Sequence, residues 1–187
     1  MVEPTDPGAQ ADALNAAGHE CLEAGDLQGA GAHFSQALEI ASQAGDRKRM
    51  AGLLNNLGHL QVRLGRLEEA LSAFQGAARI CDEIGDRLAA AWQEGNAGSV
   101  CRDRNEHEAA LAHYQQALSV FEEQGDRVGI ADQASNIGYI HAMKGEVSEA
   151  IRWFENARDG YVALGEERKA RLATRNIEVL RAQDEGQ

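Results

Sequence analysis

The sequence predicts an all-α protein, built as a solenoid of four helix pairs and one closing helix. Five columns of like residues recur at a spacing of forty residues, and no proline follows Pro7 in the 187-residue chain. A period of roughly 20–50 residues is typical of repeat architectures. A long proline-free stretch rich in Ala, Leu, Glu, Gln and Arg is what long helices require.

The repeated columns place small, aromatic and amide residues at fixed positions of each unit. The asparagine column begins only in the second unit, because Ala16 stands at its place in the first. The columns are Gly18, Gly58, Gly98 and Gly138; Ala30, Ala70, Ala110 and Ala150; Phe34, Phe74, Tyr114 and Phe154; Ala37, Ala77, Ala117 and Ala157; and Asn56, Asn96, Asn136 and Asn176. Columns of this kind indicate one structural unit copied four times.

Apolar residues follow helical spacing twice within each unit. In the second unit Leu53, Leu57 and Leu60 define a first helix, and Leu71 and Phe74 begin the apolar face of a second. The predicted helices, in chain order, are 9–24, 27–44, 47–64, 67–84, 87–104, 107–124, 127–144, 147–164 and 167–183.

Two kinds of turn separate these helices. Within each pair the chain turns at Gly25, Gly65, Asn105 or Gly145, residue types that tolerate the left-handed conformation after a helix. Between pairs the tripeptide Gly-Asp-Arg recurs at 45–47, 85–87 and 125–127. Its glycine ends one helix, and Asp46, Asp86 and Asp126 are predicted to cap the next. Its arginines, Arg47, Arg87 and Arg127, are expected to pair with acidic residues of the adjacent repeat.

The repeats also predict the domain organisation. Residues 1–8 are expected to form a disordered lead-in, 9–183 a single superhelical domain, and 184–187 a tail. The expected repeats are 9–45, 46–85, 86–125 and 126–165, followed by a capping helix at 166–183. In this last helix Glu178 stands in the glycine column, which suits a face that meets water.

Composition excludes several classes of function. A net charge of −12 disfavours binding to nucleic acid or to an anionic membrane surface. Three scattered cysteines argue against a disulfide scaffold, and no apolar run suggests a signal peptide or a membrane span. A cytoplasmic setting is therefore expected.

The columns resemble the tetratricopeptide repeat pattern over roughly residues 11–180. That family has a small residue, then alanine, an aromatic and alanine again, here Gly18, Ala30, Phe34 and Ala37 and their copies. The forty-residue period and the absence of proline near the end of the second helix depart from the common pattern. The longer period, with Gly-Asp junctions and Asn-x-Gly in the first helix, resembles the LGN/Pins, kinesin-light-chain and bacterial Rap subclasses. The resemblance implies a right-handed superhelix whose first helices line a groove for a peptide or protein segment.

The resemblance also implies which positions line that groove, namely the second, fifth, ninth, twelfth and thirteenth of each first helix. We call these positions the groove rows. The candidate ligand-binding residues in them are Asn15, His19, Asn55, His59, Arg63, Trp92, Arg102 and Tyr139. Trp92 is the sharpest candidate because its counterparts are Asp or Gly, although it could equally pack against a neighbouring helix. The asparagine column could bind a peptide backbone or bond a neighbouring helix.

The predicted function is a non-catalytic protein-interaction scaffold. The rows carry Asp12, Glu23, Asp103 and Asp132, so a segment with apolar anchors and some basic residues is the expected ligand. The alternatives are a self-assembling homo-oligomeric module and a sensory peptide-binding module of a larger regulatory system. No catalytic motif is present, and His19 and His59 lack further ligands for a metal, so neither cofactor nor metal is expected.

Overall fold

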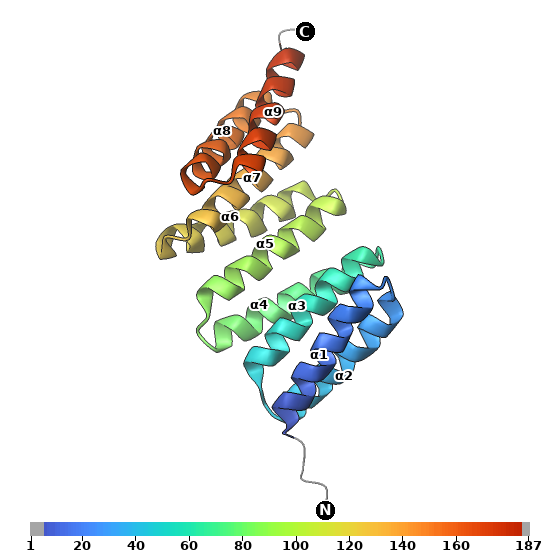
Figure 1. The fold of residues 1–187 in the computed structure, drawn as a ribbon. Coiled ribbons are helices and arrows are strands. Elements are labelled where there is room, and N and C mark those ends of the chain that lie inside the picture. Colours follow the sequence, from blue (N-terminus) through green and yellow to red (C-terminus); the bar gives the residue numbers. More distant parts are fainter. Residues whose placement is uncertain (1–5, 185–187) are drawn as a thin grey trace, which may run out of the picture. The chain divides into compact units, whose positions relative to one another are not determined.

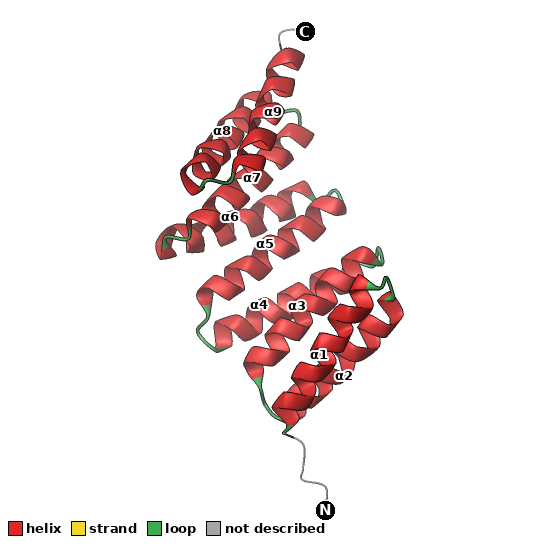
Figure 2. Cartoon of the chain, viewed as in Figure 1, coloured by secondary structure: helices red, strands yellow, loops and turns green. Residues whose placement is uncertain are grey.

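The computed structural model describes residues 6–184, and this part of the chain contains nine α-helices and no strand. Figure 1 shows these helices in chain order, and Figure 2 shows the short loops that join them. The all-α repeat fold predicted from the sequence is confirmed. The helices are α1 (Pro7–Glu23), α2 (Leu27–Gln43), α3 (Arg47–Arg63), α4 (Leu67–Glu83), α5 (Arg87–Asp103), α6 (His107–Gln124), α7 (Arg127–Met143), α8 (Val147–Leu164) and α9 (Glu167–Asp184).

Helix length explains the forty-residue period. A typical helix of this chain has 17 residues, and three residues separate it from the next. Helices α6 and α8 have 18 residues, and the turns that follow them, at 125–126 and 165–166, are one residue shorter. The extra helical residue is therefore offset by the turn, and the register of the repeats is preserved.

The chain ends differ from the prediction. Helix α1 begins at Pro7, two residues earlier than expected, and the Asp6 carboxylate accepts a hydrogen bond from the Gly8 backbone N–H at 3.1 Å. Proline suits this position because the first helical N–H has no partner in the helix. Residues 7 and 8 of the predicted lead-in are thus helical, as is Asp184 of the predicted tail. Asp6 is also described and precedes the helix, whereas residues 1–5 and 185–187 lie outside the described residues.

The turns have the conformations that their residue types favour. Gly45 has φ 68° in the first Gly-Asp-Arg junction, and Asn105, at φ 61°, is the one non-glycine residue with positive φ in the described range. Asp46 accepts from the Arg49 N–H at 3.0 Å and so caps α3. Arg47 pairs with Glu83 at 3.1 Å, a residue of its own repeat, so the expected pairing with an adjacent repeat is wrong there.

Close packing of the glycine column on the aromatic column holds each helix pair together. A Cβ added to Gly18 would lie 2.4 Å from the Phe34 ring, and one added to Gly58 would lie 2.6 Å from Phe74. Both rings are almost fully buried. Glycine is therefore required at these two positions, because only a hydrogen leaves room for the ring of the second helix.

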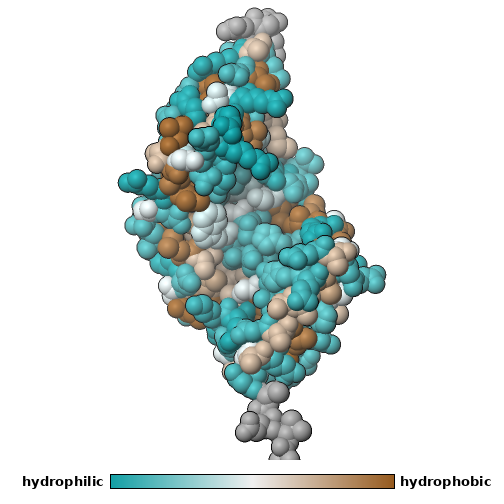
Figure 3. Space-filling view, in the orientation of Figure 1, coloured by the Kyte–Doolittle hydropathy of each residue, from teal (hydrophilic) through white to brown (hydrophobic). Residues whose placement is uncertain are grey.

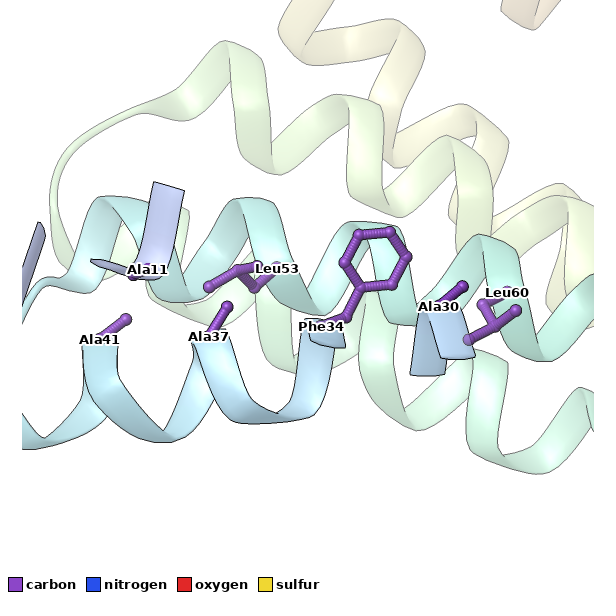
Figure 4. Close-up of a cluster of buried hydrophobic side chains, with 7 residues drawn as sticks. All are labelled: Ala11, Ala30, Phe34, Ala37, Ala41, Leu53 and Leu60. Atoms are coloured by element: carbon purple, nitrogen blue, oxygen red, sulfur yellow. The ribbon is translucent and has the colours of Figure 1, made fainter. Parts of the chain in front are cut away.

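The described residues divide into two compact units, with the boundary between Gln93 and Glu94. In the first unit α2 packs on α1 and α3, and α3 on α4. Its core includes Ala30, Phe34, Ala37 and Leu60, shown in Figure 4. In the second unit α7 packs on α6 and α8, and α8 on α9. The predicted single domain 9–183 stays a prediction.

Hydrophilic residues cover much of the surface seen in Figure 3, with hydrophobic residues in scattered patches between them. Seven large hydrophobic residues are exposed in the described range. Met143, Val179 and Val162 are among them, at 49%, 48% and 64% exposure, and all three lie in the second unit.

Candidate functional site

In the first unit, groove-row residues of α1 and α3 line a pocket of about 220 Å³. Asp12 and Asn15 come from α1, and Gly52 and Asn55 come from the same two rows of α3. Asn15 and Asn55 are half-buried. Two of the predicted ligand-binding residues are therefore brought together in this polar pocket, which we call the α1–α3 pocket.

Asn56 of the asparagine column ties α3 to α1 beside this pocket. Its Nδ2 donates to Asn15 Oδ1 at 2.8 Å and lies 3.2 Å from His19 Nε2. The His19 ring also packs edge-on against Phe34, with ring centroids 5.2 Å apart. At this position the asparagine column bonds a neighbouring helix, which was one of the two roles expected for it.

Asp12 forms an ion pair that the sequence analysis missed. Its carboxylate accepts two hydrogen bonds from the Arg49 guanidinium, at 2.8 and 2.9 Å, and Arg49 also pairs with Asp46. The hydrogen bond from Arg49 lowers the pKa of Asp12, and the Arg49 backbone N–H and guanidinium lower the pKa of Asp46. The two carboxylates in turn raise the pKa of Arg49.

The other candidates of the first unit lie apart from this pocket. The His59 ring packs edge-on against Phe74 with centroids 5.1 Å apart, and its partial burial lowers its pKa. Arg63 is exposed in the last turn of α3, and Trp92 is half-buried in α5.

In the second unit Tyr139 occupies the place of His19, 120 residues further along. Its ring packs edge-on against Phe154 at 5.0 Å between centroids, and its hydroxyl oxygen accepts from Asn176 Nδ2 at 2.9 Å. Asn176 thus ties α9 to α7 as Asn56 ties α3 to α1. The remaining candidate, Arg102, pairs with its neighbour Asp103 at 2.9 Å.

Asp132 is the second-unit counterpart of Asp12, and it is also paired. It accepts from Lys169 Nζ at 2.7 Å and from the Tyr161 hydroxyl at 2.8 Å. Burial, followed by the nearby Asp132 carboxylate, raises the pKa of Tyr161. Three of the four groove-row carboxylates, Asp12, Asp103 and Asp132, are therefore paired with basic residues of this chain, which weakens the expectation of a basic ligand.

A second pocket, of about 340 Å³, lies among α7, α8 and α9. We call it the α7–α9 pocket. Sequence analysis placed Tyr139 and Met143 in the groove rows but missed the contribution of α9. Extending the fifth, ninth and thirteenth rows by one more repeat would have identified Arg175, Val179 and Gln183. The residues lining it are Tyr139, Ala142, Met143, Phe154, Arg175, Asn176, Val179, Leu180 and Gln183.

Reactive and metal-binding groups are poorly placed for chemistry. No cluster of three His, Cys, Asp or Glu residues suited to a metal occurs among residues 6–184. Cys81 and Cys101 are buried, and burial raises the pKa of both thiols, whereas Cys21 is half-buried. The thiolate is the reactive form, so the two buried cysteines are suited to packing.

None of the helices among residues 6–184 is both long and apolar enough to cross a bilayer.

The repeats and their groove rows define a class of α-helical repeat protein. The tetratricopeptide repeat family model matches residues 9–75 and 49–123, which together cover more than half of the chain. The protein belongs to the tetratricopeptide repeat family. This repeat fold is typically a non-catalytic interaction module, and membership supports a protein-interaction scaffold as the class of function. Comparison with curated proteins finds no match.

Solved structures share the fold at low sequence identity. BtubC (BKLC) from P. vanneervenii is 21% identical, with a TM-score of 0.73 over 99% of this chain and 85% of that one. Aspartyl phosphate phosphatase F from Bacillus subtilis is 17% identical, with a TM-score of 0.84 over 96% of this chain. A signal transduction ATPase with a tetratricopeptide repeat sensor, from Pyrococcus horikoshii, is 16% identical, with a TM-score of 0.88 over 95%. This chain spans 46% and 28% of the last two proteins.

Proposed function

We propose that this protein is a non-catalytic scaffold that binds a peptide or protein segment along the groove rows of its first helices. The observation that carries the proposal is the coincidence of pockets with these rows. The α1–α3 pocket is lined by second-row and fifth-row residues, and the α7–α9 pocket by ninth-row, twelfth-row and thirteenth-row residues. Concave sites with a few polar groups are the default binding-site candidates.

The chemistry of the rows supports recognition of a polypeptide. Asn15 and Asn55 carry both donors and acceptors, which suits the alternating N–H and C=O groups of an extended backbone. Trp92 and Tyr139 are candidate anchors for apolar side chains, because aromatic residues dominate binding energy at many interfaces. The expected partner is a protein or peptide; neither nucleic acid nor membrane is expected for so acidic a chain. A cytoplasmic setting belongs to the same proposal, and the three unpaired cysteines support it.

A phage-displayed library of random dodecapeptides, selected on the whole chain, tests this proposal. Affinities of the recovered peptides are then measured for the wild type and for Asn55→Ala, Trp92→Ala and Gln75→Ala. Gln75 is an exposed residue of a second helix and serves as the matched control. We expect at least one groove-row variant to weaken binding by about tenfold, in the range of interface hot spots. Equal affinity across all three variants, each shown to be folded by circular dichroism, would place the binding face elsewhere.

Two alternatives remain predictions. A sensory module is favoured by the likeness to the Pyrococcus protein, whose repeats are named a sensor. Self-assembly would make the apparent mass rise with concentration in light scattering, whereas the scaffold proposal needs no such rise.

A further inference from the structure

The α7–α9 pocket differs in character from the α1–α3 pocket. Its floor includes Phe154 and Leu180, which are 1% and 8% exposed, while Met143 and Val179 on its walls are about half exposed. A volume of about 340 Å³ lies at the small end of ligand pockets. It suits one large apolar side chain of a partner.

Tyr139 supplies one polar group at this pocket. Asn176 donates to the hydroxyl oxygen at 2.9 Å, and packing on Phe154 holds the ring. Within residues 6–184 no acceptor takes the hydroxyl hydrogen in a hydrogen bond. The phenol can therefore donate to an oxygen of a bound partner.

Arg175 supplies the second polar group. It is exposed, lines the pocket and forms no ion pair with any described residue. Three other cations of α9 are already engaged, because Lys169 pairs with Asp132, Arg171 with Glu167 and Arg181 with Glu155. Arg175 is thus an uncompensated positive charge beside an apolar cavity, in a chain whose net charge is −12.

We propose that the α7–α9 pocket binds a partner segment that inserts one large apolar side chain and places an adjacent Asp or Glu against Arg175. This inference rests on the proposed function and names the class of ligand at one end of the binding face. A carboxylate matches the planar guanidinium and can also accept from the Tyr139 hydroxyl. A basic residue is disfavoured there, because Arg175 is itself positively charged and Asp132, the groove-row carboxylate of α7, already accepts from Lys169 and Tyr161.

Short peptides of fixed sequence provide the test. The probes are capped octapeptides with the central pair Phe-Glu, Phe-Gln, Phe-Lys or Ser-Glu between Gly-Ser flanks. They are titrated into the whole chain carrying ¹³C-labelled Met and Val methyl groups. We expect Phe-Glu to shift the Met143 and Val179 signals with a dissociation constant on the order of 1 mM, and about fivefold more tightly than Phe-Gln. Ser-Glu should not bind.

Two variants separate the apolar contact from the contact with the carboxylate. Val179→Asn should abolish the Phe-Glu shifts, and Arg175→Gln should remove the preference for Glu over Gln. Val162→Asn and Arg168→Gln are matched controls, since both residues are exposed in the second unit and lie outside the pocket. Both controls should bind as the wild type does.

Several results would overturn this inference. Preferred binding of Phe-Lys would exclude an acidic partner. A preference for Glu over Gln that survives Arg175→Gln would exclude Arg175 as the group that recognises the carboxylate. Concentration-dependent Met143 and Val179 signals without peptide would assign the pocket to a second copy of the chain. Dodecapeptides that bind the whole chain and depend on Asn55 or Trp92, but not on Val179, would leave the scaffold proposal standing and remove this one. Absence of binding by every peptide would remove both.

Discussion

The α1–α3 and α7–α9 junctions are built on one plan and present different surfaces. Positions 120 residues apart correspond, and those that join the helices carry the same residue: the buried Phe34 matches Phe154, and the half-buried Asn56 matches Asn176. The groove-row positions mostly differ: Asp12 and Asp132 are both Asp, but Glu23 is replaced by Met143. His19 corresponds to Tyr139, Asn55 to Arg175, and His59 to Val179.

This comparison separates two kinds of information in the chain. Residues of the repeated columns are constrained because each fills space in a close-packed helix pair, where a change in volume of even one methylene group disturbs the packing. Row residues have a free side, so they can change the chemistry of the surface without disturbing the packing. The polar junction and the apolar junction are therefore two surfaces carried by the same scaffold.

The largest expected effect tests the shared core. Phe34→Ala and Phe154→Ala should each reduce the free energy of unfolding by about 3–5 kcal/mol, because each empties a buried space. Urea unfolding of the two variants measures this. A difference of several kcal/mol between them would show that the two junctions do not share one packing plan.

The glycine column should distinguish the two ends. A Cβ at Gly18 would lie 2.4 Å from Phe34, whereas one at Gly138 would lie 3.1 Å from Phe154. Gly18→Ala should therefore be destabilising, with overpacking of about 1–3 kcal/mol exceeding the helix-propensity gain of about 1 kcal/mol. Gly138→Ala should be nearly neutral in the same urea experiment.

Gly52→Ala provides the control for those two variants. A Cβ at this exposed helical position meets nothing within 4 Å, so only the propensity gain remains. We expect a stabilisation of about 0.5–1 kcal/mol. Equal behaviour of all three glycines would contradict the packing role of the column.

The paired carboxylates give a smaller contrast. The side chain of Asp132 is 23% exposed and accepts two hydrogen bonds from different residues, while that of Asp12 is 62% exposed. Asp132→Asn should cost about 1–3 kcal/mol of stability, as expected for hydrogen bonds to a partly buried charge. Asp12→Asn should cost less because solvent screens an exposed pair. Thermal unfolding of both variants measures the two losses of stability, and equal losses would show that the two pairs are equivalent.

The smallest expected effect is a pH dependence at the first junction. The lowered pKa values of Asp12 and Asp46 mean that the folded chain binds protons less readily than the unfolded chain at acidic pH. Their stabilisation is present above the ordinary Asp pKa and is lost as pH falls through the lowered values. The melting-temperature difference between the wild type and Arg49→Gln should therefore shrink on going from pH 7 to about pH 2. A constant difference would show that Arg49 acts by packing alone.

The helices could be predicted closely because the same helix boundaries recur at the same positions in successive repeats. The positions of Gly45 and Asn105 mark turns by dihedral preference, and the apolar spacing marks the faces between them. The exception is the start of α1, which lies at Pro7 and not at residue 9, because proline is suited to the first helical position.

The candidate site was only partly predictable. The groove rows follow from the pattern within a single helix, whereas their side chains form hydrogen bonds with the first helix of the following repeat. These partners lie 37 positions further along the chain: Asp12 bonds with Arg49, and Tyr139 with Asn176. Charges that look available in the sequence are engaged through these contacts. The apolar walls of the α7–α9 pocket come partly from α9, which was considered only as a closing helix.

The three cysteines allow the rate of local unfolding to be measured by thiol modification. Cys21 is half-buried in α1, while Cys81 and Cys101 are buried near the ends of α4 and α5, with raised thiol pKa values. A maleimide added at neutral pH should therefore modify Cys21 first. Modification of the other two requires their helices to open, so their labelling rates would report how often the middle of the chain unfolds locally. Mass spectrometry of timed samples would read both rates from one unaltered protein.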